Sequence, residues 1–320
     1  MKKYYKLAYA LIIAAILALI IFIPVIRNTE EKRPKIISTT FVGYDLARSI
    51  IQDSYLDAEM LLSPGTDLHS YEPSPQDIIK IKESDVFIYN GGESEEWLNN
   101  IISEIDTNKT AVIRMMDVVE LLEETDDNIL ESEEGEEEET EYDEHIWTSP
   151  QNVQKICSKI TSIISEKYPQ YREIFAKNLQ TENNAISELD SDFRQIAKST
   201  TQPIIMADRF PLRYFVHEYG FDYIAAFPGC SEQTEASAKT ISTLIDQVKS
   251  SKAKAIFHIE LSNQQIANTV KDATGVKVLE FHSAHNISQA DFDAGKTYLD
   301  LMRQNYLNLK EALHETTDSE

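Results

Sequence analysis

A helical pattern between Pro169 and Thr200 is the feature that most constrains the fold of this chain. Its apolar residues recur mostly at intervals of three, four or seven, as on one face of a helix, and no proline interrupts the segment after Pro169. At 1.5 Å per residue, about 30 helical residues span about 45 Å, enough to run the length of a two-lobed protein. The pattern therefore predicts a long rigid helix over residues 168–200, between two lobes.

Short strands and helices alternate on both sides of this segment. Stretches rich in β-branched and apolar residues, including Lys35–Thr40, Asp85–Asn90 and Ala253–Glu260, predict strands, and helical stretches follow them. Such alternation is typical of parallel sheets with helical crossovers. The predicted fold class is therefore α/β, with two lobes that each hold a parallel-type sheet and are joined by the long helix.

The predicted domain boundaries follow from these segments and from the length of 320 residues, which exceeds the usual size of a single core. We expect an anchor and linker at residues 1–34, an N-terminal lobe at 35–167, the helix at 168–200, a C-terminal lobe at 201–314 and a tail at 315–320.

The amino terminus predicts a membrane anchor. Three lysines precede Leu7–Ile26, an uncharged run of 20 residues that is long enough to cross a bilayer as a helix. The run is longer than the apolar core of a typical cleaved signal, and no small-x-small cleavage site follows it. We expect an uncleaved signal-anchor in the cell membrane, with the bulk of the protein on the extracytoplasmic face. The alternative is a buried core helix.

The charge distribution excludes one class of partner. The formal net charge is −24, which argues against binding to nucleic acid because phosphate binding needs a basic surface. Residues 120–144 hold 15 of the 54 acids, and their centre, Glu131–Glu141, cannot form a hydrophobic face. We expect a mobile solvated loop there. Collection of exchangeable cations near a binding site is the alternative.

Histidines and acids at the ends of predicted strands are candidate metal ligands, because ligands of open α/β sheets bind beyond the carboxyl ends of the strands. His69 lies in the loop PGTDLHSYEPSP, and His145 lies four residues before a helix start at Ser149. His282 follows a strand, with His285 three residues later, and Glu260 ends another strand. Three or four such donors suffice for zinc without a local motif. The two cysteines, Cys157 and Cys230, fall in different lobes and are expected to be small apolar fillers, with a disulfide between them as the alternative.

The order of these segments resembles the metal-binding, substrate-capturing components of ABC importers for zinc and manganese, the ZnuA/TroA-like family. The likeness covers Ile36 to Leu313. PGTDLHSYEPSP looks like the first ligand motif of the family, and DEHIWTSP resembles the second, Asp-Pro-His-x-Trp-x-x-Pro. The resemblance implies two α/β lobes joined by a rigid helix, with the metal between them.

The resemblance also implies a ligand set, with one departure. His69 and His145 match the first two ligands, and His282 falls on the fourth position. At the third, where the family has His-Asp-Ala-Phe, this chain has Ala207-Asp208-Arg209-Phe210, so the imidazole is missing. Glu260 is the preferred replacement, and Asp208 and His285 remain open.

The function that the resemblance implies is binding rather than catalysis. We expect a monomeric solute-binding protein that captures a divalent transition ion and delivers it to an ABC permease in the cytoplasmic membrane. Three imidazoles favour Zn2+ over Mn2+ as the transported ligand. The alternatives are a manganese-preferring homologue, a surface adhesin with a structural metal, and a zinc hydrolase with Glu260 or Glu72 as its base.

Overall fold

The computed structural model describes residues 33–66, 68, 71–125, 127–131, 141–231 and 235–313. The chain divides into two compact units, Met1–Pro34 and Lys35–Glu320, and the fold below is that of the second. The expected anchor at Leu7–Ile26, His69 and the centre of the acidic run lie outside the described residues. Within the described ranges, none of the helices combines the length and the apolar character that a membrane span requires.

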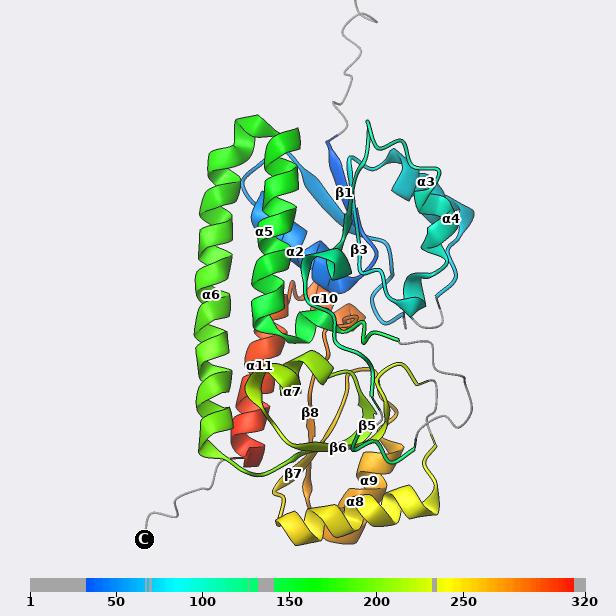
Figure 1. Cartoon of the computed structure of the whole chain (residues 1–320), viewed down its shortest axis with the longest axis vertical. Coiled ribbons are helices and arrows are strands. Elements are labelled where there is room, and N and C mark those ends of the chain that lie inside the picture. The colour runs from blue at the N-terminus through cyan, green and yellow to red at the C-terminus, as the bar shows by residue number, and fades with distance from the viewer. Residues whose placement is uncertain are drawn as a thin grey trace, which may run out of the picture. The chain divides into compact units, whose positions relative to one another are not determined.

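The first half of this unit is built on a four-stranded parallel sheet with the strand order β2-β1-β3-β4. Its strands are β1 (Lys35–Ser38), β2 (Asp57–Met60), β3 (Val86–Tyr89) and β4 (Ala111–Arg114). Helices α2 (Phe41–Ile51), α3 (Pro75–Glu83) and α4 (Leu98–Ile102) connect them (Figure 1). Successive residues of a strand face opposite sides: Ile36 packs in the core that includes α2, whereas Ile37 packs against α3 and α4.

The second half repeats this plan with the strand order β6-β5-β7-β8, also parallel. Its strands are β5 (Ile204–Phe210), β6 (Tyr223–Pro228), β7 (Ala255–His258) and β8 (Lys277–Glu280). The helices of this half are α7 (Arg213–Tyr219), α8 (Ala238–Ser251), α9 (Gln265–Thr274), α10 (Gln289–Asp293) and α11 (Tyr298–Leu313). One face of the sheet packs on α8 and α9, and the other face belongs to the core that includes α7 and α11.

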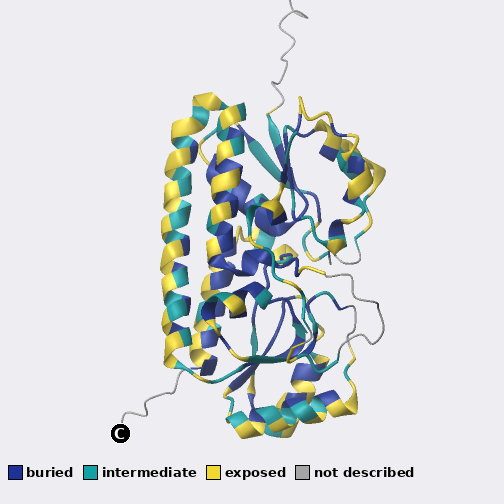
Figure 2. Ribbon diagram, viewed as in Figure 1, coloured by how far each residue is buried: buried dark blue, intermediate teal, exposed yellow. Residues whose placement is uncertain are grey.

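Helix α6 (Arg172–Ser199) runs alongside both halves, as the sequence predicts. It packs against α5 (Pro150–Lys167), against α2 of the first half and against α11 of the second. Its inner stripe, from Phe175 to Ile196, is buried, while the outer face is largely exposed (Figure 2). The predicted α/β class, with two parallel sheets and one long connecting helix, is therefore confirmed.

Two local expectations differ from the structure. β7 ends at His258, so Glu260, which was expected to end this strand, lies two residues beyond it. The start of the acidic run is also not a free loop. Ile129 pairs with Ala225 at the edge of β6, because Ile129 and Leu130 are apolar and pack on the second sheet.

Candidate metal centre

His145 lies at the beginning of a short 3-10 turn, η4 (Ile146–Thr148), directly before α5. Ser149 caps α5 by accepting a hydrogen bond from the backbone N–H of Asn152, and this cap fixes the junction. The side chain of His145 is fully buried. Its backbone N–H donates to Asp143 Oδ1 at 2.8 Å, and its ring Nδ1 lies 3.2 Å from the same oxygen. A carboxylate on Nδ1 orients a histidine so that Nε2 can bind a metal.

Carboxylates dominate the electrostatics around this imidazole. Burial lowers the pKa of His145, but Asp143, Glu144 and Glu124 together outweigh it and raise the pKa above the usual value. Burial, with Asp143 nearby, also raises the pKa of Glu124 to about 7. Negative charge thus gathers in a place with little water, where a bound cation would relieve the repulsion.

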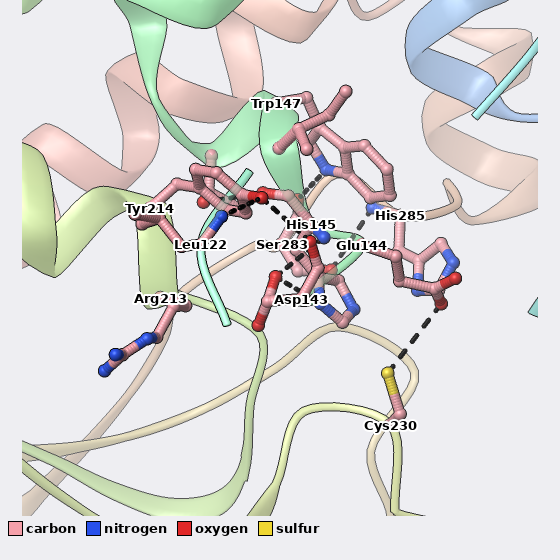
Figure 3. A network of polar contacts seen from close by, with 12 residues as sticks. Leu122, Asp143, Glu144, His145, Trp147, Arg213, Tyr214, Cys230, Ser283 and His285 are labelled. Carbon is pink, nitrogen blue, oxygen red and sulfur yellow. Dashed lines mark hydrogen bonds and ion pairs between the residues drawn. The ribbon is translucent and has the colours of Figure 1, made fainter. Parts of the chain in front are cut away.

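Glu144 is buried, and hydrogen bonds from Ser94 hold one of its two carboxylate oxygens. Ser94 donates to Oε2 from its hydroxyl at 2.7 Å and from its backbone N–H at 3.3 Å. Gly92 makes room for this carboxylate, because a Cβ there would lie 2.0 Å from Glu144 Oε2. The other oxygen, Oε1, accepts a hydrogen bond from the thiol of Cys230 at 3.8 Å (Figure 3).

Cys230 comes from the loop that follows β6. It is half-buried, and burial together with Glu144, Glu124 and other acids raises the pKa of its thiol well above the usual value. Glu144, His145 and Cys230 can each offer one metal-binding atom, and these atoms all lie within 4.8 Å of one another. In the described part of the chain this is the one such group of three or more histidine, cysteine or carboxylate side chains.

His285, from the loop after β8, stands beside this group. Its ring centroid is 5.2 Å from that of His145, with the two rings perpendicular, and 5.4 Å from that of Trp147. The loop is held by Ser283, whose carbonyl accepts a hydrogen bond from Trp147 Nε1 at 2.8 Å (Figure 3). The structure therefore brings His145 and His285 together from opposite halves of the chain.

Glu260 and His282 are engaged in building this loop. Glu260 accepts hydrogen bonds from the backbone N–H and the hydroxyl of Ser283, at 2.6 and 2.5 Å. His282 Nδ1 accepts from the backbone N–H of Ala284 at 3.0 Å, and its own backbone is bound in both directions by Asn305. Neither residue joins the three-residue group, although they approach each other to 3.7 Å.

Asp208 likewise has a backbone role. On β5, its Oδ1 accepts from the backbone N–H of Arg209 at 2.8 Å, and its Oδ2 accepts from that of Ile259 at 3.4 Å. His217 is exposed on α7, away from the residues above. Of the predicted ligands, the structure thus gathers His145 and His285, while His69 lies outside the described residues.

Comparison with known proteins places this geometry in a family. The family model "ZnuA: Zinc-uptake complex component A periplasmic" matches residues 36–312. The chain belongs to this zinc-uptake component A family. The zinc-binding lipoprotein AdcA of Streptococcus pneumoniae strain R6 is 28% identical over 312 residues, 97% of this chain and 61% of AdcA. The chain thus spans about three fifths of the length of that relative.

A second relative and two solved structures are also similar to this chain. The high-affinity zinc uptake system protein ZnuA of Bacillus subtilis is 26% identical over 298 residues, 89% of each chain. The Zn(II)-bound ZnuA-like domain of S. pneumoniae AdcA superposes with a TM-score of 0.73 and 25% identity, over 88% of this chain and all of that domain. The periplasmic zinc-binding protein TroA of Treponema pallidum, with a TM-score of 0.69 and 21% identity over 88% of this chain and 100% of its own, shares the fold.

Two members of the group, Glu144 and Cys230, were not among the predicted ligands. The expectation of an apolar filler fits Cys157, which is buried in the main core, but it is wrong for Cys230, which contacts a carboxylate. A signal was available in the sequence, because Cys230 follows the apolar run Tyr223–Phe227 and a Pro-Gly pair, a strand-end position like those of the histidines.

Proposed function

We propose that this chain is the extracytoplasmic solute-binding component of an ABC importer, which captures zinc and delivers it to a permease. Membership of the zinc-uptake family and the names of AdcA and ZnuA support this proposal. The observation that carries it is the group of Glu144, His145 and Cys230, with His285 beside it. Nitrogen, sulfur and carboxylate oxygen are the donors that zinc accepts.

In this proposal His145 and His285 are ligands of the transported ion, and His69 is a third. The described residues before His69 support its inclusion, since they are bound to the His285 loop. Gly65 N–H donates to the carbonyl of Ile287 at 2.8 Å, and the amide of Asn286 donates to the carbonyls of Ser63 and Thr66. Glu260 and His282 then support the loop rather than bind the ion.

Replacing His145 or His285 by alanine tests this ligand set. Loss of a ligand should weaken zinc binding by about 100-fold or more, beyond the 10–100-fold typical of outer-shell partners. Affinity is measured by competition with a zinc chelator, and the matched control is His217→Ala on the exposed face of α7. Zinc affinity of His145→Ala equal to that of the wild type would refute the assignment.

Delivery to a permease needs a cellular test. In a strain that lacks the gene, the wild-type chain should restore zinc uptake under zinc limitation, and His145→Ala should not. Normal uptake in the deletion strain, with loss of surface attachment instead, would favour the adhesin. Hydrolysis that depends on added zinc would favour the enzyme.

We further propose that residues 1–34 anchor the protein in the cell membrane, that 35–167 and 201–314 are its two lobes, and that it acts as a monomer. The uncharged run Leu7–Ile26 supports the anchor. Deleting residues 1–34 should move the protein from the membrane fraction to the soluble fraction without loss of zinc binding. Recovery of the truncated chain with the membrane would contradict the anchor.

A further inference from the structure

The strand β5 contributes no imidazole to the candidate metal centre. Ala207 stands where the sequence resemblance expects a histidine, and it packs with Phe227 and Leu244 in the apolar core of the second sheet. The neighbouring strand β6 ends in the loop that carries Cys230, and this loop reaches the buried histidine instead.

The approach of this loop depends on Gly229. A Cβ at Gly229 would lie 3.2 Å from His145 Cε1 and 3.0 Å from the carbonyl oxygen of Phe210, closer than most real contacts. The missing side chain therefore lets the backbone before Cys230 pack directly on the imidazole ring. This contact brings the next residue, Cys230, close to His145, and the metal-binding atoms of the two residues lie within 4.8 Å of each other.

The distances within the group suit a zinc ion. Donors that lie 2.0–2.3 Å from a tetrahedral zinc are separated from one another by about 3.3–3.8 Å. Cys230 Sγ and Glu144 Oε1 are already 3.8 Å apart, and no pair in the group exceeds 4.8 Å. Shifts of about 1 Å would therefore complete the coordination.

The remaining polar atoms of two donors are already engaged. Glu144 Oε2 is occupied by Ser94, which leaves Oε1 turned toward the sulfur. His145 Nδ1 lies 3.2 Å from Asp143 Oδ1, so Nε2 is the ring nitrogen that we assign to the ion. Such support from neighbouring groups is what orients donors for a metal.

We propose that Cys230 is a thiolate ligand of the transported ion beside His145, with the Glu144 carboxylate facing the sulfur, and that it selects zinc over manganese. As the sulfur–metal bond forms, the S–H bond breaks and its proton passes to solvent. Thiolate is a soft donor that suits zinc, whereas manganese prefers carboxylate, carbonyl and water. This inference rests on the proposed function and names the donor that sets the selectivity of the same site.

Cobalt(II) is the probe, because it occupies zinc sites and a thiolate bound to it absorbs strongly in the near ultraviolet. The full chain, purified in detergent, should show this charge-transfer band on titration with cobalt. Cys230→Ser and Cys230→Ala should lack the band, and each should bind zinc about 100-fold more weakly or worse. Cys157→Ala is the matched control, since it removes the other thiol and should keep both the band and the affinity.

The outcomes separate this inference from the proposed function. If the wild type and Cys230→Ser bind zinc equally and neither shows the band, Cys230 is not a ligand, while metal capture stands. If the wild type binds no zinc at all, both proposals fail. The ratio of zinc to manganese affinity gives a second readout: it should fall in Cys230→Asp, and an unchanged ratio would overturn the selectivity. Circular dichroism of each variant verifies that it is folded.

Discussion

Asp143 offers the sharpest test of how the imidazole of His145 is held. Its Oδ1 accepts the backbone N–H of His145 at 2.8 Å and lies 3.2 Å from ring Nδ1, with both side chains buried. Asp143→Asn keeps the size of the side chain but removes the charge that orients the ring. Loss of such a partner costs about 10–100-fold in metal affinity, or about 1.4–2.7 kcal/mol.

The assay is competition with a zinc chelator at neutral pH, on the full chain, with thermal unfolding measured in parallel. Asp190→Asn is the control, since Asp190 also accepts hydrogen bonds, from Arg194 and Tyr219, but lies on α6. Zinc affinity should fall in Asp143→Asn and hold in Asp190→Asn. Equal affinity of Asp143→Asn and the wild type would show that the ring needs no such support, and the reasoning about the centre would fail.

Three further predictions concern the surroundings of the centre. Gly92→Ala would place a Cβ 2.4 Å from Glu144 Cβ, so we expect the carboxylate to move. The free energy of unfolding, measured by urea denaturation, should fall by about 1–3 kcal/mol. Unchanged stability and zinc affinity would contradict this prediction. Burial raises the pKa of Glu95 to about 7, so this residue stabilises the metal-free fold below about pH 4.5 and loses that contribution as pH rises to about 7. Relative to Glu95→Gln, the wild type should thus lose up to about 3 kcal/mol across that window, and a pH-independent difference would refute the cause. Glu260→Gln should be less stable than the wild type by about 1.5–3 kcal/mol, because the charged hydrogen bonds from Ser283 are weakened. The same variant should bind zinc more tightly than His145→Ala does. If the two variants lost zinc affinity equally, Glu260 would be a ligand.

The features of the fold that could be predicted from the sequence are those with a local cause. The buried stripe of α6 repeats with the helical period, so the length of this helix could be predicted to within a few residues. The start of α3 also has a local cause, because Ser74 and Asp77 form a reciprocal cap around Pro75. The order of the segment Asn128–Glu131 could not be predicted in this way, because it comes from pairing with β6, almost 100 residues later in the chain.

The candidate metal centre could be predicted only in part, because contacts between distant loops determine which donor side chains come together. The rule that ligands follow strands named His145 and His285 as candidates, and the structure brings these two rings together. It also favoured Glu260, whose carboxylate is occupied by Ser283, 23 residues away. Nothing in the residues around Glu260 predicts that partner. Cys230 was not proposed as a ligand, since its polar neighbour Glu144 lies 86 residues away along the chain.

The contacts between the two halves also bear on how the ion could leave. Trp147 donates to Ser283, and Asp45 of α2 accepts the backbone N–H of Tyr298 at the start of α11, at 2.7 Å. Helix α6 packs on α2 and α11 without interruption. A wide opening of the two halves would have to break these buried hydrogen bonds and bend helix α6, and both changes cost free energy. Movement of a single donor loop would break fewer of these hydrogen bonds, and the loop of Cys230 contacts the centre through a thiol hydrogen bond at 3.8 Å and the packing of Gly229 on His145.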